Sequence, residues 1–416
     1  MSPTRKPRIL WASQSPSIHT GYGVIAHDIL LRLQATKKYD IACQGWFEPV
    51  APNPTFPFEG LNSSKFPFPI YTTNAQDADI NDMAARNGKR TIDTIINHFK
   101  PDIIIFFGDI YMMDWIETHP SLKNQHIVAY YPVDGLPIPE KWKRFLQYVD
   151  TPVTFSQFGQ NVSTATLNHP VDMIYHGVDY PMWSQPLDPI SRKTKRIQMF
   201  GDDDICVFGM VARNQPRKNI PAFYEAFSKH SKNYPKSRLL MHACRIDQGW
   251  NLDRLAMEYG ITNKVYITPN LTPNRGVDAR ELKTIYNCMD VHVNTAWGEG
   301  FGIPIIESMA CGVPNIVPAY TVGPEFIGES KGGGLIKVAN FLVEQGSHIR
   351  RACVDIKHLE DTMNKLAEEP KLRLQLSKAA QKYAANFNWP SIIKQWETLL
   401  DNIPIGPKTR IRPEEV

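Results

Sequence analysis

The chain has 416 residues, 42% of them hydrophobic, and this length predicts two globular domains rather than one. Its 46 basic and 42 acidic residues leave a net charge of +4, so the composition gives no electrostatic case for a dedicated nucleic-acid-binding protein. Six scattered cysteines show no C-x-x-C pair and no metal-ligand spacing, which indicates reduced thiols. No apolar run approaches the roughly 20 residues of a membrane span, and the basic N-terminus leads into a strand. We therefore expect a cytoplasmic protein without a transmembrane segment.

Short apolar segments alternate with helical patterns in the first 180 residues. Strands are predicted at residues 8–13, 41–43, 103–107, 127–131 and 152–156, and helices at 24–33 and 91–99. This alternation is typical of a parallel, doubly wound sheet. Residues 46–71 are rich in Pro and Phe and lack periodicity. They indicate an irregular surface insertion, which either shapes a site or passively covers the sheet.

A second series of strands follows the polar, proline-containing residues 181–204, which are predicted to form an interdomain linker with a solvated basic run. Strands are predicted at residues 206–211, 238–242, 265–268, 291–293 and 315–317, and helices at 220–234, 253–259, 279–289, 303–310, 371–386 and 391–402. The pattern therefore predicts an α/β chain. Two Rossmann-like, doubly wound domains, residues 1–180 and 205–387, would face a central cleft.

The most informative motif spans residues 294–314, where a buried strand end leads through a glycine-rich turn into a helix. Gly300 and Gly302 let backbone amides approach a ligand, and the free N–H groups of a helix start form an anion site. Glu299 is expected on the rim of the loop, and Glu307 about one turn inside the helix. Carboxylates at such positions accept hydrogen bonds from sugar or ribose hydroxyls.

Glu299-x7-Glu307, followed by Ser-Met-Ala-Cys-Gly-Val-Pro, resembles the Glu-x7-Glu signature of the retaining glycosyltransferases of family 4. The resemblance implies the GT-B fold, with a nucleotide-sugar donor bound by the second domain and an acceptor bound by the first. Glu299 would then bind the donor sugar and Glu307 the ribose. The resemblance also implies that the C-terminal helix within residues 388–416 packs back on the first domain.

Arg213 and Lys218 match the Arg and Lys with which this family holds the donor diphosphate. They follow the first strand of the second domain, at the edge where open α/β sheets bind ligands. Fixed positive charge there stabilises the charge that builds on the departing diphosphate. The amides of Gly300, Phe301 and Gly302 would help to hold the sugar and the leaving group. Since no Asp-x-Asp pair stands out, we expect no essential metal ion and no other cofactor.

Further residues are assigned to the site by the same resemblance. Gly21 and Gly23 belong to a loop after the first strand that would face the donor across the cleft. Arg245 and Asn270 lie in loops that surround the nucleotide in the family, but the usual glycine-rich turn is replaced here, so the identity of the base is not predicted. Asp134 stands in a region where many members carry a His. It either orients an acceptor hydroxyl or caps the next turn.

Three alternatives stay open at this stage. Viral enzymes of this fold glycosylate modified DNA bases, and such an enzyme would have to flip its target base out of the duplex. Gly21-Tyr-Gly23-Val-Ile-Ala26 also satisfies the nicotinamide fingerprint G-x-G-x-x-A of an oxidoreductase, although about eight residues separate it from the preceding strand. A protein that binds a nucleotide-sugar without catalysis would keep Glu307 and Arg213 and transfer nothing. The acceptor, whether a glycan, a lipid-linked glycan, a small molecule or a modified DNA base, is not predicted.

Overall fold

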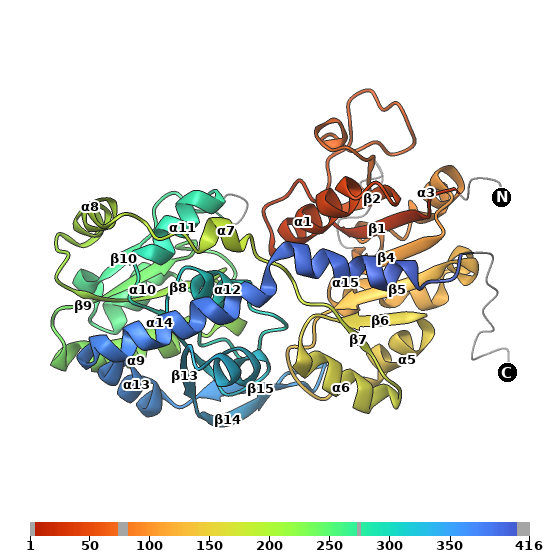
Figure 1. The fold of residues 1–416 in the computed structure, drawn as a ribbon. Coiled ribbons are helices and arrows are strands. Elements are labelled where there is room, and N and C mark those ends of the chain that lie inside the picture. The colour runs from red at the N-terminus through yellow and green to blue at the C-terminus, as the bar shows by residue number, and fades with distance from the viewer. Residues whose placement is uncertain (1–4, 74–81, 273–275, 406–416) are drawn as a thin grey trace. The chain divides into compact units, whose positions relative to one another are not determined.

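The computed structural model describes residues 5–73, 82–272 and 276–405, which fold into two compact α/β units (Figure 1). The first unit comprises Met1–Val133, Ile138–Tyr175 and Pro390–Val416, and the second comprises Asp134–Pro137 and His176–Trp389. Each unit has its own hydrophobic core and its own parallel sheet. The predicted fold class of two doubly wound α/β domains is therefore confirmed.

The first unit is built on a seven-stranded parallel sheet in the order β3-β2-β1-β4-β5-β6-β7. Its strands are β1 (Arg8–Gln14), β2 (Asp40–Trp46), β3 (Ile70–Thr72), β4 (Ile103–Phe107), β5 (His126–Tyr131), β6 (Thr151–Thr154) and β7 (Asp172–Met173). Its helices are α1 (Gly21–Ala35), α2 (Met83–Arg86), α3 (Ile92–Phe99), α4 (Ile110–Met113), α5 (Glu140–Tyr148) and α6 (Gln157–Leu167). All five residues of β4 are apolar and buried, as a central strand covered on both faces requires.

The C-terminal helix α15 (Trp389–Asp401) contributes to the core of the first unit from Pro390 onward. Trp396 is fully buried, with ring centroids 5.5 Å from Trp11 and 4.9 Å from Tyr130. The Tyr39 hydroxyl donates to Asp401 at 2.7 Å. The chain therefore returns to the first unit at Pro390.

The second unit contains a six-stranded parallel sheet in the order β10-β9-β8-β11-β12-β13, and a separate two-stranded antiparallel sheet of β14 and β15. Its strands are β8 (Cys206–Val211), β9 (Ser237–His242), β10 (Val265–Ile267), β11 (Val291–Val293), β12 (Asn315–Pro318), β13 (Gly333–Ile336), β14 (Val338–Val343) and β15 (Arg350–Val354). Its helices are α7 (Tyr180–Trp183), α8 (Pro189–Phe200), α9 (Ile220–Asn233), α10 (Leu252–Glu258), α11 (Ala279–Asn287), α12 (Ile303–Ala310), α13 (Ile356–Glu368) and α14 (Pro370–Ala384).

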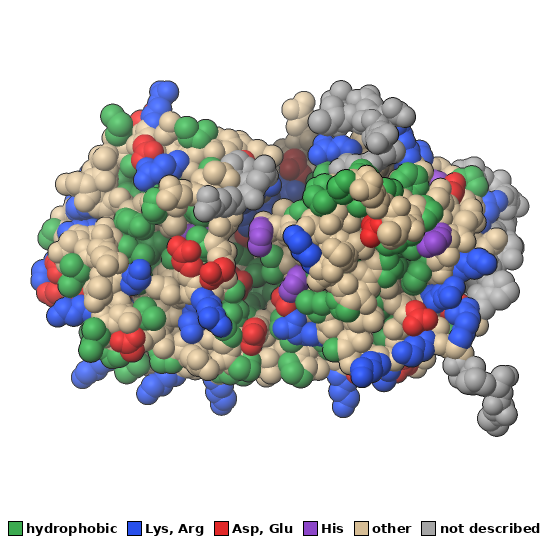
Figure 2. All heavy atoms as spheres, turned by 90° about the horizontal axis from the view of Figure 1, so that it is seen from above, with side chains coloured by type: hydrophobic (Ala, Val, Ile, Leu, Met, Phe, Trp, Pro, Cys, Tyr) green, Lys and Arg blue, Asp and Glu red, His purple; other side chains and the backbone are tan. Residues whose placement is uncertain are grey.

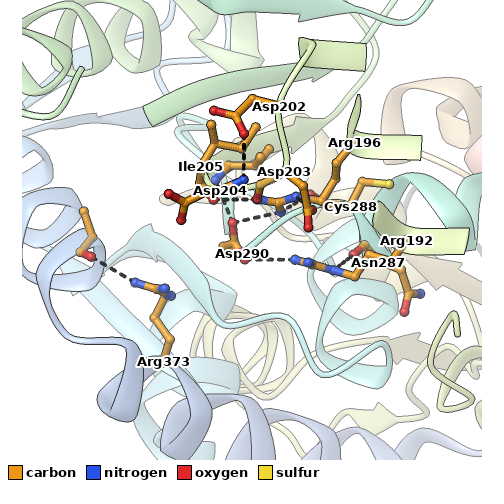
Figure 3. A network of polar contacts seen from close by, with 12 residues as sticks. Arg192, Arg196, Asp202, Asp203, Asp204, Ile205, Asn287, Cys288, Asp290 and Arg373 are labelled. Atoms are coloured by element: carbon orange, nitrogen blue, oxygen red, sulfur yellow. Dashed lines mark hydrogen bonds and ion pairs between the residues drawn. The ribbon is translucent and has the colours of Figure 1, made fainter. Parts of the chain in front are cut away.

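Residues 181–204, expected to be a linker with a solvated basic run, belong to the second unit and contain α8. Arg196 of this helix is only 1% exposed and contacts the carboxylates of Asp290 and Asp203 at 3.0 Å each. Arg192, one turn earlier on the same face, reaches Asp290 at 3.0 Å (Figure 3). The basic run therefore has a buried side, which anchors α8 to the residue that precedes β11.

Replacing Arg196 with Ala removes the more buried of the two α8 guanidinium groups that donate to Asp290, and it also removes the donor to the carbonyls of Cys288 and Ile205. We expect the free energy of unfolding to fall by about 3–5 kcal/mol, measured by urea denaturation of the purified protein. Lys193→Ala, on the exposed side of the same helix, is the matched control and should change stability by less than about 0.5 kcal/mol. Equal effects of the two substitutions would contradict a structural role for the network.

Candidate functional site

A buried ion pair lies at the carboxyl edge of the second sheet. Lys218 ends a short 3-10 turn after β8, and Glu299 follows β11, the neighbouring strand. The Lys218 Nζ atom donates to Glu299 Oε1 at 2.5 Å, and Arg217 contacts Glu299 Oε2 at 3.2 Å. Glu299 is 7% exposed. The expectation that Glu299 lies on the rim of the loop is therefore wrong, because the carboxylate turns inward toward two cations.

The pKa of Glu299 reflects this environment. Burial alone would raise it, but the charges of Lys218 and Arg217 and the bond donated by Asn294 Nδ2 at 3.1 Å outweigh burial and lower it from 4.5 to about 2. The pKa of Lys218 is lowered, chiefly because the ammonium group is buried and has Arg217 beside it, while Glu299 acts in the opposite sense. The site thus holds a carboxylate that stays ionised at neutral pH.

Thr321 fixes the backbone of the same loop. The amide of Glu299 donates to Thr321 Oγ1 at 3.1 Å. Thr321 adopts a left-handed conformation with φ of 49°, which is costly for a β-branched residue. A cavity of about 10 Å³, room for about one water molecule, lies between Glu299, Thr321 and Asn294. Strained backbone therefore occurs at the position that orients the buried carboxylate.

The glycine-rich turn leads into α12 as predicted. Gly302 has a left-handed φ of 79° and occupies the N-cap position, and Gly300 is half-buried. The Phe301 ring lies in a buried aromatic cluster, with ring centroids 4.8 Å from His176 and 5.3 Å from Phe326. Its side chain is therefore part of the core, and the backbone amides of this turn are the groups that can face an anion.

Glu307 lies in α12, four residues after its first residue, and is half-buried. The Tyr286 hydroxyl of α11 donates to Glu307 Oε2 at 2.9 Å. Burial and the nearby Glu307 both raise the pKa of Tyr286, which therefore stays a neutral donor. Sequence reasoning missed Tyr286, because no motif links α11 to the Glu-x7-Glu segment.

Arg213 has a carboxylate partner of its own. Its Nε atom contacts Asp247 Oδ2 at 2.9 Å, and the side chains are 45% and 4% exposed, respectively. Asn214 Nδ2 donates to the carbonyls of Cys244 and Trp250 at 3.0 and 2.6 Å. These bonds fix the loop after β9 against the loop after β8. Asp247 was missed, although it lies in the segment that replaces the usual glycine-rich turn.

Arg245 and Asn270 lie in the loops after β9 and β10, each three residues beyond the end of its strand. Arg245 forms an ion pair with Asp253 and donates to the Ile267 carbonyl at 3.4 Å. Asn270 is exposed and has a left-handed φ of 61°. A cavity of about 310 Å³ opens beside it, lined by residues that include Lys195, Tyr266, Thr268, Leu271 and Glu281.

Gly21 and Gly23 lie in the first turn of α1, not in the preceding loop as expected. Thr20 caps this helix, and its hydroxyl accepts from the Gly23 amide at 3.1 Å. A Cβ atom added at Gly23 would lie 2.3 Å from the Ile18 carbonyl oxygen. Gly23 is therefore required by close packing of the helix start, which explains this glycine of the pattern without a dinucleotide.

A buried carboxylate in the first unit organises the loop after β1. Glu48 is fully buried, and its Oε2 atom accepts from the hydroxyls of Ser15 and Ser17 at 2.5 Å each. Its Oε1 atom accepts from the backbone and side-chain nitrogens of Asn62 at 2.8 and 2.9 Å. The insertion at residues 46–71 therefore fixes this loop. No periodic pattern in these residues indicates that role.

Asp134 belongs to the second unit, although it follows β5 of the first unit in the sequence. Its carboxylate forms an ion pair with Arg351 of β15 at 2.8 Å, and Arg351 also donates to the Asp134 carbonyl at 3.1 Å. Asp134 also contributes to the electrostatic environment of Lys218. The structure therefore brings Asp134, Lys218 and Glu299 to one region.

Within the described residues, no group of three or more His, Cys, Asp or Glu side chains has an arrangement that could hold a metal ion. The independence from metal ions stays a prediction. No helix in this part of the chain combines the length and the apolar character that crossing a membrane requires.

Solved structures with the same architecture define the fold. Sucrose-phosphate synthase from Thermosynechococcus elongatus superimposes with a TM-score of 0.72 over 95% of this chain and 98% of its own, at 16% identity. HepE of Anabaena, solved with UDP and glucose, gives a TM-score of 0.70 over 95% of this chain and 100% of its own, also at 16% identity. The chain therefore has the GT-B fold that the Glu299-x7-Glu307 motif implied.

Sequence comparisons relate the second unit to a particular family, which is more specific than the fold. Residues 191–383 match the family Glycosyl transferases group 1. The D-inositol 3-phosphate glycosyltransferase of Mycolicibacterium smegmatis is 26% identical over 224 residues, 53% of this chain and 44% of the relative. That of Salinispora arenicola is 27% identical over 191 residues, 44% of this chain and 38% of the relative. The matches thus span less than half the length of these relatives. Residues 191–383 are therefore similar to the group 1 glycosyl transferases, in line with the resemblance to family 4.

The lowered pKa of Glu299 predicts a pH-dependent contribution to stability. Because its folded-state pKa of about 2 lies below its ordinary value of 4.5, the contribution is present above pH 4.5 and is lost as the pH falls toward 2. Glu299→Gln should therefore be less stable than the wild type at pH 7. The difference should narrow by up to about 3 kcal/mol between pH 5 and pH 2.5, measured by urea denaturation.

Glu258→Gln is the matched control, since this residue is exposed on α10 and pairs with Arg254 on the same helix surface. Its stability difference from the wild type should stay small at every pH. A difference for Glu299→Gln that does not change with pH would contradict the ion pair.

Proposed function

We propose that the protein is a glycosyltransferase that moves a sugar from a nucleoside-diphosphate sugar to an acceptor hydroxyl. The observation that carries this proposal is the buried pair of Lys218 and Glu299 beside the start of α12. It lies within the segment that matches the family Glycosyl transferases group 1. HepE was also solved with UDP-glucose, which makes UDP-glucose the first donor to test.

Each side chain has a role that its surroundings support. Lys218 supplies a fixed positive charge for the donor diphosphate, and Arg213, which is 45% exposed, would exchange its contact with Asp247 for a phosphate oxygen. Glu299 and the amides of residues 300–302 would hold the sugar and the leaving group. Glu307, oriented by Tyr286, would accept bonds from the ribose.

We further propose retention of configuration by front-face attack, in which the departing phosphate accepts the acceptor's proton. Asp134 is tied to Arg351 by a charged bond at 2.8 Å, which suits a group that orients a hydroxyl better than a nucleophile that bonds to carbon. In this mechanism the bond from the anomeric carbon to the diphosphate breaks. The bond to the acceptor oxygen forms on the same face of the sugar.

The alternative functions receive less support. Packing accounts for Gly23, the second glycine of the oxidoreductase fingerprint. Acidic side chains lie among the Lys and Arg side chains in Figure 2, and the net charge of +4 gives no electrostatic case for DNA binding. A binding protein without catalysis would hold the donor and release no nucleotide product, which an assay of donor hydrolysis detects.

The first functional prediction concerns the two cations. Arg213→Ala and Lys218→Ala should each lower kcat by about 100-fold, because each removes one donor that stabilises the leaving group. The measurement is release of the nucleoside diphosphate from the donor, with folding checked by circular dichroism. Lys232→Ala, exposed near the end of α9, is the control and should leave the rate unchanged. Near-normal rates of both variants would contradict the assignment.

The second functional prediction is stereochemical. With an α-linked donor such as UDP-glucose, proton NMR of the product should show an α-glycoside. A β-linked product would exclude retention, and a trapped glycosyl-Asp134 adduct would replace front-face attack with double displacement. Asp134→Asn should slow transfer without abolishing it.

A further inference from the structure

The antiparallel hairpin of β14 and β15 packs against the short segment Asp134–Pro137, which belongs to the same unit. The Arg350 amide donates to the Leu136 carbonyl at 2.8 Å, and the two residues form an antiparallel bridge. The Tyr320 hydroxyl accepts from the Leu136 amide at 3.2 Å and donates to the Arg350 carbonyl at 2.8 Å. Backbone bonds therefore fix the segment in one register against the hairpin.

Two glycines allow the segment to approach both of its neighbours. A Cβ atom added at Gly135 would lie 2.4 Å from Ile349 Cγ2, at the hairpin. One added at Gly298, the residue before Glu299, would lie 1.9 Å from the Asp134 carbonyl oxygen. Any side chain at either position would collide with these atoms. The segment is thus enclosed between the hairpin and the loop that carries Glu299.

Arg351 lies where these elements meet. Its Nη1 atom contacts Asp134 Oδ1 at 2.8 Å, and its Nη2 atom contacts Glu344 at 2.9 Å. The side chain of Arg351 is 11% exposed and that of Asp134 is 27% exposed. The next residue, Ala352, donates its amide to the Trp297 carbonyl at 2.9 Å. The hairpin is therefore bonded both to the candidate acceptor-orienting residue and to the loop of the buried ion pair.

We propose that Arg351 is a positioning residue, which fixes the carboxylate of Asp134 so that its Oδ2 atom faces the attacking hydroxyl or water. A planar guanidinium suits this role, because it can hold a carboxylate and a carbonyl at once in a fixed geometry. The inference rests on the proposed function, since it takes Asp134 as the group that orients the attacking oxygen. The β14–β15 hairpin then stabilises the position of Asp134 at the site of the reaction.

The test measures hydrolysis of UDP-glucose, in which water is the acceptor, by detecting the UDP that is released. Another nucleotide-sugar replaces UDP-glucose if the wild type hydrolyses it faster. Arg351→Gln should lower kcat on the order of 10- to 100-fold, with the KM for the donor within twofold, because the attacking oxygen is misplaced while the donor still binds. The double variant with Asp134→Asn should be no slower than the slower single variant, because the two residues act as one unit.

Two further variants separate positioning from folding. Arg351→Lys should recover part of the rate, since an ammonium group can still reach Asp134. Arg350→Gln, at an exposed neighbour whose backbone forms the bonds described above, should keep the wild-type rate. An unchanged kcat for Arg351→Gln in an active wild-type background, or additive effects in the double variant, would overturn this inference alone. A wild type that releases no nucleotide from any donor would overturn the proposed function and this inference with it.

Discussion

The ion pair between Lys218 and Glu299 constrains the geometry of the candidate site in the second unit. Two ionised groups that are each less than 10% exposed would be unstable there alone, so the loops after β8 and β11 have to meet in one geometry. The meeting is enforced from several sides. The Trp297 amide donates to the Arg217 carbonyl at 2.8 Å. The Thr321 hydroxyl accepts from the Glu299 amide, and the backbone of Thr321 is strained.

Other parts of the unit extend this constraint outward. The loop after β9 places Asp247 in contact with Arg213, and the β14–β15 hairpin places Arg351 in contact with Asp134. Each arrangement places a cation and a carboxylate in contact, so the net charge near the site stays moderate. The charged side chains are nevertheless held in fixed positions. A pre-arranged set of this kind stabilises charge that develops in a reaction without the cost of reorganising dipoles.

Local patterns in the sequence predicted the elements that depend on local information. Apolar runs such as residues 103–107 have one interpretation, which is a strand buried on both faces of a parallel sheet. The start of α12 at Ile303 was also predicted, because Gly302 and Pro304 mark a helix start by their backbone preferences. The identity of the fold followed from this one segment.

Features that depend on distant partners were not predicted. The basic helix α8 looks solvated in the sequence, because two acceptors of Arg196, the Cys288 carbonyl and the Asp290 carboxylate, lie 92 and 94 residues away. Glu299 was placed on the rim because nothing in the motif shows that it meets Lys218. The contact between Asp134 and Arg351 joins residues 217 positions apart and depends on a hairpin with no recognisable motif. Long-range pairing of this kind has no periodic signature.

Amide hydrogen exchange with and without UDP tests most directly whether the carboxyl edge of the second sheet binds a nucleoside diphosphate. The account predicts that UDP slows exchange at residues 213–219 and at 299–305, the two loops that the buried pair joins, and that Lys218→Met abolishes both effects while Lys232→Ala leaves them intact. Binding of UDP that protects neither segment, or protection that survives Lys218→Met unchanged, would contradict the account.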